Sequence, residues 1–71
     1  MSFKNKMVLV AGGTGLIGIP LVKLLLGEGA DVRIAALNNP YCIFPERTEL
    51  IDLIEYQNCL KVTKNIDYVF N

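Results

Sequence analysis

The chain has 71 residues, with seven basic and seven acidic side chains and a formal net charge of +0. This length allows one small domain, and the hydrophobic fraction of 52% suggests strands that are covered on both faces. The balanced charge argues against nucleic-acid and membrane-surface partners, and the absence of histidine removes the usual metal ligand and proton shuttle. We therefore expect no nucleic acid, no membrane and no metal site.

The cysteines and the apolar N-terminal stretch bear on the compartment. Cys42 and Cys59 lack the Cys-x-x-Cys spacing of a redox or zinc site, so we expect two reduced thiols in a cytoplasmic protein. Residues 1–26 are mostly apolar, but glycines, Pro20 and Lys23 interrupt them. We therefore expect neither a signal peptide nor a membrane span there.

A short apolar run over residues 7–10, Met-Val-Leu-Val, predicts the first strand. A glycine-rich turn follows, in which Gly12, Gly15 and Gly18 fit Gly-x-x-Gly-x-x-Gly. The first glycine lets the chain reverse off the strand, the second lets backbone approach a phosphate, and the third lets a helix lie close to the strand. The pattern predicts a cradle for a dinucleotide pyrophosphate. The alternative is a structural glycine turn that binds no ligand.

The turn leads into a helix predicted over residues 16–26, which the Gly-Glu-Gly of residues 27–29 ends. We expect the free amides around Leu16 and Ile17 to point at the anion, with the positive end of the helix dipole behind them. Thr14 is expected to cap this helix. The alternative for Thr14 is donation of its hydroxyl to a phosphate.

A second buried strand over residues 30–37 completes a β-turn-α-β unit of about thirty residues. The next elements are predicted as a loop with one helical turn over 38–47 and a third strand over 48–53. A helix over 55–64 and a fourth strand over 66–70 follow. One face of that helix is expected to carry Tyr56, Cys59, Leu60 and Thr63. This order favours an α/β fold, a partial Rossmann fold with a parallel four-stranded sheet in the order 3-2-1-4 and about one helix per face.

Three stretches carry a resemblance to a known family: the glycine turn at 12–18, Asp52-Leu53 after the third strand, and residues 65–71. Together they resemble the N-terminal part of an extended short-chain dehydrogenase/reductase of the NAD-dependent epimerase/dehydratase group, which acts on nucleotide sugars. Within that group the chain is most similar to the GDP-fucose-synthase-like reductases. The resemblance implies that residues 1–71 are the N-terminal part of an NAD(P)-binding Rossmann domain.

The resemblance also implies which residues bind the cofactor. The pyrophosphate would be held by Gly12, Gly15 and Gly18 with the amides of Leu16 and Ile17. Asp52 would accept a hydrogen bond from the adenine amino group, and Leu53 would pack on the adenine ring. The alternative for Asp52 is a cap for the helix that begins near Glu55. Asn71 would lie beside the cofactor ribose, at the edge where parallel sheets bind ligands.

The end of the second strand departs from the pattern of NAD-preferring folds, which place an acid there to hold the ribose hydroxyls. Residues 36–39 read Ala-Leu-Asn-Asn, which puts Asn38 at the cofactor position. A missing carboxylate removes repulsion toward a 2′-phosphate, yet no arginine follows immediately to bind one. The cofactor is therefore NAD or NADP, with NADP slightly favoured.

The catalytic pattern that the resemblance implies, a tyrosine four residues before a lysine, does not occur in these residues. Tyr41 and Tyr56 are followed at that distance by Pro45 and Leu60, and the chain ends before that point for Tyr68. We therefore assign no catalytic residue and expect the 71-residue chain alone to be inactive.

Three functions stay open. The chain is the cofactor-binding portion of a nucleotide-sugar epimerase, dehydratase or reductase, a stand-alone dinucleotide-binding module without catalysis, or a self-associating module with a vestigial glycine turn. A sheet with one helix per face leaves apolar strands bare and the fourth strand as an open edge. We therefore expect a homo-oligomer whose interface covers Val69, Phe70 and part of the second strand.

Overall fold

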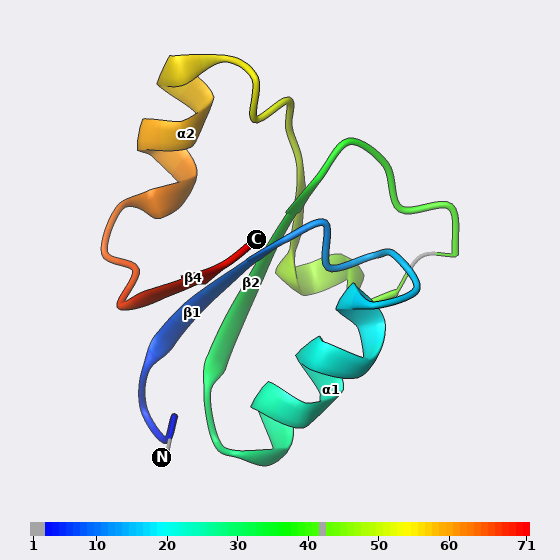
Figure 1. Cartoon of the computed structure of the whole chain (residues 1–71), viewed down its shortest axis with the longest axis vertical. Helices are drawn as coiled ribbons and strands as arrows, with labels where there is room; N and C mark the ends of the chain where they lie inside the picture. The colour runs from blue at the N-terminus through cyan, green and yellow to red at the C-terminus, as the bar shows by residue number, and fades with distance from the viewer. Residues whose placement is uncertain (1–2, 42) are drawn as a thin grey trace.

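A computed structural model describes residues 3–41 and 43–71 (Figure 1). Its elements are β1 (Met7–Ala11), α1 (Gly18–Gly27), β2 (Asp31–Ala36), the 3₁₀ turn η1 (Pro45–Arg47), β3 (Thr48–Leu50), α2 (Tyr56–Thr63) and β4 (Tyr68–Phe70). Cys59 is a free thiol, whereas Cys42 lies outside the described residues. Among the described residues, no helix has the length and apolar character needed to cross a bilayer.

The four strands form one parallel sheet in the order β3-β2-β1-β4, as the sequence predicted. Val8 of β1 pairs with Val32 of β2 on one side and with Tyr68 of β4 on the other. The two central strands are the most buried, because each has neighbours on both edges, although Asp31 and Arg33 of β2 are exposed. β3 pairs only with the second half of β2, starting at Ile34.

Side chains of the strands alternate between two cores, one on each face of the sheet. The larger core lies under α1 and contains Val8, Val10, Val22, Leu25, Ala30, Val32, Ile34 and Ala36. The smaller core, on the face covered by α2, contains Leu9, Ala35 and Val62. Figure 1 shows the two helices on opposite sides of the sheet. The prediction of one helix per face is confirmed.

The first helix begins at Gly18, two residues later than predicted. Residues 15–17 form a separate turn, in which the Gly15 amide donates to the Gly12 carbonyl at 3.1 Å. The Gly15 carbonyl in turn accepts from the Ile19 amide at 3.0 Å. The amides of Leu16 and Ile17 therefore precede the helix instead of forming its first turn.

The end of α1 matches the prediction. Gly29 adopts a φ of 85°, a left-handed conformation that glycine reaches without steric cost. The Ala30 amide donates to the Leu25 carbonyl at 3.1 Å, and the Gly29 amide to the Leu26 carbonyl at 3.1 Å. This pair of bonds is a Schellman motif, which reverses the chain into β2.

The second half of the chain has shorter strands than predicted. β3 ends at Leu50 instead of residue 53, because the chain leaves the sheet once the Ile51 amide has donated to the Ala36 carbonyl at 2.9 Å. β4 begins at Tyr68 instead of residue 66, after a turn in which Asn65 has a φ of 62°. The helical turn predicted in the 38–47 loop is present as η1.

The face predicted for α2 is wrong except at Cys59, which is partly buried. Tyr56 is 71% exposed and Leu60 is 50% exposed, whereas Val62 is 8% exposed and packs on the sheet. The rotation of the helix is fixed at its first turns, where Asn58 and Cys59 hydrogen-bond to the segment after β3. These two positions and Val62 share the inward face, since residues three and four apart are neighbours on a helix.

Candidate functional site

A cleft of about 550 Å³ opens at the carboxyl edge of the sheet, beyond the ends of β1, β2 and β3. Four separate segments meet there: the glycine turn, the end of β2, the segment after β3 and the end of the chain. The lining residues are Ala11, Gly12, Thr14, Gly15, Ala35, Ala36, Leu37, Asn38, Ile51, Asp52, Leu53, Ile54 and Asn71. Open parallel sheets bind ligands at this edge.

The cleft collects most of the residues predicted as a cofactor site. Those that line it are Gly12, Thr14, Gly15, Asn38, Asp52, Leu53 and Asn71. Leu16, Ile17 and Gly18 do not line it. The side chains of Leu16 and Ile17 are 94% and 85% exposed, and Gly18 is buried behind the turn.

Two glycines of the turn are required by the fold itself. Gly12 has a φ of 76°, so a side chain there would be strained. A Cβ on Gly18 would collide with the Gly12 carbonyl oxygen and lie 2.6 Å from the Gly13 Cα. The predicted roles of these glycines, reversal off the strand and close approach of the helix, are confirmed. Gly13 is a packing glycine, since its Cβ would lie 2.9 Å from Ile34 Cγ2.

Gly15 differs from the others because nothing in the fold demands a glycine there. Its φ is outside the left-handed region, and a Cβ would meet only the Gly12 carbonyl oxygen at 3.5 Å, an ordinary contact. The missing side chain therefore leaves open space on the cleft side of the turn. A group that must touch backbone, such as a phosphate, would use that space.

Amide donors lie close to this open space. Within residues 3–41 and 43–71, no group accepts a hydrogen bond from the amide of Leu16 or Ile17. Both amides sit at the N-terminal end of α1, where the helix dipole favours negative charge. They lie outside the lining of the cleft, so a ligand would reach them by extending beyond its rim.

Thr14 does not cap α1, contrary to the prediction. Ile17 occupies the N-cap position, and no side chain bonds to the helix start. The Thr14 hydroxyl instead donates to the Asn38 carbonyl oxygen at 2.9 Å, and the residue is 8% exposed. The late start of the helix explains this change, because it places Thr14 three residues before the N-cap. Its one hydroxyl proton is committed to Asn38, so in this conformation it does not donate to a phosphate.

Asp52 does not cap α2, so the alternative considered for it is wrong. The N-cap of α2 is Glu55, and no side chain bonds to the helix start. Asp52 Oδ1 accepts from the Ile54 amide at 2.9 Å, which closes an Asx turn at the mouth of the cleft. Among the described residues that line the cleft, Asp52 is the one with a charged side chain. Its second oxygen has no partner within the described chain and is able to accept a hydrogen bond.

Six apolar residues of the cleft were not predicted, and two of them, Leu37 and Ile54, are large and exposed. Leu37 follows β2 and is 72% exposed, and Ile54 follows Asp52 and Leu53 and is 89% exposed. Leu37 directly follows the end of β2, and that position is the signal that would have found it, whereas Ile54 lies four positions beyond the end of β3 and has no such signal.

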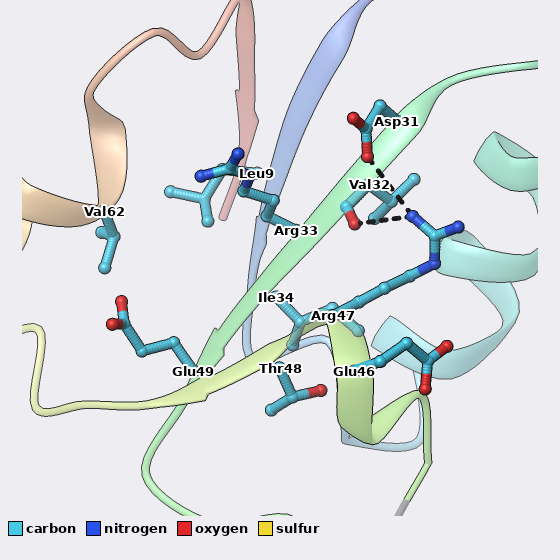
Figure 2. A pocket seen from close by; sticks show the side chains of 10 residues that line it. All are labelled: Leu9, Asp31, Val32, Arg33, Ile34, Glu46, Arg47, Thr48, Glu49 and Val62. Atoms are coloured by element: carbon cyan, nitrogen blue, oxygen red, sulfur yellow. Dashed lines mark hydrogen bonds and ion pairs between the residues drawn. The ribbon is translucent and has the colours of Figure 1, made fainter.

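A second hollow, of about 550 Å³, lies beside the first half of β2, which β3 leaves unpaired. Figure 2 shows the side chains that line it. Arg47 covers this edge, since its guanidinium donates to the Val32 carbonyl at 3.2 Å and pairs with Asp31 at 3.4 Å. Glu49 pairs with Lys61 at 3.1 Å. None of the predicted site residues lies in this hollow. Arg47 is held here, away from the lining of the first cleft.

The parallel sheet, its glycine turn and the cleft at its carboxyl edge define the class of Rossmann-like α/β proteins. The chain belongs to the NAD dependent epimerase/dehydratase family, whose model matches residues 8–71. Among solved structures, an X-ray structure of Pen from Bacillus thuringiensis matches with a TM-score of 0.90 and 33% sequence identity. The match covers 100% of this chain and 26% of that chain. A comparison with curated proteins found no match.

Proposed function

We propose that this chain is the dinucleotide-binding N-terminal portion of a cytoplasmic NAD(P)-dependent nucleotide-sugar epimerase, dehydratase or reductase, most similar to the GDP-fucose-synthase-like reductases. The observation that supports this most is the open space at Gly15, which the fold does not require. Family membership supports a nicotinamide dinucleotide as the ligand. The alternative is a stand-alone module that binds a dinucleotide without catalysis.

The pyrophosphate would lie over Gly12 and Gly15. Gly15 supplies the space, and the unbonded amides of Leu16 and Ile17 supply donors at the positive end of α1. When bound, the nicotinamide would supply hydride chemistry. The chain's own part is to bind and orient the cofactor, so we expect no hydride transfer by the 71 residues alone.

The adenosine half would lie between the ends of β2 and β3. Asp52 offers a free carboxylate oxygen to the adenine amino group, and Leu53 offers an apolar surface to the ring. Asn38 lines the cleft beside the end of β2, where the ribose would lie, and Asn71 lines it after β4, on the other side of β1.

The choice between NAD and NADP would be weak, with NADP slightly favoured. Asn38 stands where a carboxylate would repel a 2′-phosphate, so NADP meets no like charge at that position. No arginine lines the cleft within the described chain, since Arg47 is bound to Val32 and Asp31. We therefore expect the two dissociation constants to lie within about tenfold of each other.

Titration of the 71-residue chain with NADH and NADPH tests this function, followed by nicotinamide or intrinsic tyrosine fluorescence. Saturable binding of both, with NADPH equal or slightly tighter, would support the proposal. A folded chain that binds neither cofactor at millimolar concentration would contradict it. Strong preference for NADH would contradict the role given to Asn38.

We also propose that the chain self-associates. β4 pairs only with β1 among the described strands, so its outer edge is open, and Val69 on it is 53% exposed. Phe70 is half-buried, with its ring 5.9 Å from that of Phe3. Val69 is therefore the more accessible apolar side chain of this edge.

A further inference from the structure

The segment after β3 is held in place by side chains of α2. Asn58 Nδ2 donates to the Asp52 carbonyl oxygen at 2.8 Å, and Cys59 Sγ donates to the Leu53 carbonyl oxygen at 2.9 Å. Asn58 and Cys59 are consecutive residues near the start of the helix, and both are partly buried. Two neighbouring donors of α2 thus bond to two neighbouring carbonyls of the cleft wall.

Within the described chain, no backbone hydrogen bond joins residues 52–54 to the sheet. The last bond to the sheet before this segment is from the Ile51 amide to the Ala36 carbonyl at 2.9 Å. Beyond it, the one bond that the Asp52 carboxylate makes within residues 3–41 and 43–71 is to the Ile54 amide, two residues away in the same turn. The position of Asp52 and Leu53 relative to the cleft therefore depends on these two bonds from α2 and on the packing of the Leu53 side chain against the smaller core.

We propose that Asn58 and Cys59 are positioning residues for recognition of the adenine amino group, acting through the backbone of Asp52 and Leu53. This inference rests on the proposed function, because it assumes that Asp52 accepts from that amino group. Loss of either donor leaves a carbonyl without its partner and frees the turn to move. The Asp52 carboxylate oxygen would then occupy the position that accepts from the adenine amino group for a smaller fraction of the time.

The test compares two ligands that differ only at the recognised group: NADH and its hypoxanthine analogue, in which a carbonyl replaces the adenine amino group. The wild-type chain should bind NADH more tightly than the analogue. Cys59→Ala and Asn58→Ala should weaken NADH binding about three- to tenfold, which is the range of one lost hydrogen bond. Binding of the analogue should change little, so that the preference between the two ligands shrinks.

Cys59→Ser is the matched control, because its hydroxyl keeps a donor at the same atom position. It should retain the wild-type preference, which would separate a positioning role from general loosening of the fold. Equal weakening of both ligands by Cys59→Ala, or an unchanged preference, would overturn the inference. Failure of the wild-type chain to bind either ligand would instead overturn the proposed function, and this inference with it. If Asn58→Ala does not fold, the comparison of Cys59→Ala with Cys59→Ser is sufficient to test the inference.

Discussion

The hydroxyl of Thr14 and the carbonyl of Asn38, 24 positions apart in the sequence, are joined by a hydrogen bond of 2.9 Å. The bond links the glycine turn after β1 to the loop after β2, so it connects two walls of the cleft. Because Thr14 is 8% exposed, water cannot easily replace it as the donor. The residue expected to cap a helix thus fixes the shape of the cleft.

Replacement of Thr14 by valine tests that link. The change keeps the shape of the side chain and removes the donor, so we expect a loss of about 1 kcal/mol in the free energy of unfolding. Urea denaturation followed by circular dichroism measures it. Thr63→Val is the control, since the Thr63 hydroxyl bonds to the Cys59 carbonyl at 2.7 Å within its own helix and is exposed. A Thr14 variant no less stable than the Thr63 variant would contradict this role.

Gly18→Ala should destabilise the fold by about 1–3 kcal/mol, the range for overpacking a tight contact. The new Cβ would meet the backbone of Gly12 and Gly13, which cannot turn aside as a side chain would. Gly27→Ala offers a comparison, since a Cβ there has open space and should be neutral or slightly stabilising in a helix. Thermal unfolding of both variants would show the contrast. Equal melting temperatures would show that the helix can move away from the turn.

The sequence predicted the first half of the fold well because its signals are local. The apolar runs of the first two strands, the glycine turn and the Gly29 stop each act within a few residues. No local sequence signal predicts the rotation of α2 or the early end of β3. They depend on bonds from Asn58 and Cys59 to carbonyls six residues away, which exist only once the elements have packed. The glycine pattern and the family resemblance predicted seven residues that line the cleft, whereas Leu16, Ile17 and Gly18 lie outside its lining and the exposed Ile54 carries no local signal.

Val69→Lys should shift the assembly toward monomer. Val69 is paired with Leu9 in register and lies on the open edge strand, where a charge opposes pairing with another chain. Leu24→Lys is the control, because Leu24 is 63% exposed on α1, away from that edge. Light scattering at micromolar concentration measures the masses. A wild-type chain that stays folded at a mass near 7.9 kDa would contradict self-association.

Binding of a dinucleotide by the glycine turn is tested by cofactor titration of Gly15→Val beside Gly27→Val. Both substitutions put the same bulk where a Cβ meets ordinary contact or open space, so both chains should fold. If Gly15 leaves room for the cofactor phosphates, Gly15→Val should lower NADPH affinity at least about tenfold, the effect of a lost phosphate contact. Gly27→Val, on the far end of α1, should bind as the wild-type chain does. Undiminished affinity in a folded Gly15→Val chain would contradict the assignment of the glycine turn as a phosphate cradle.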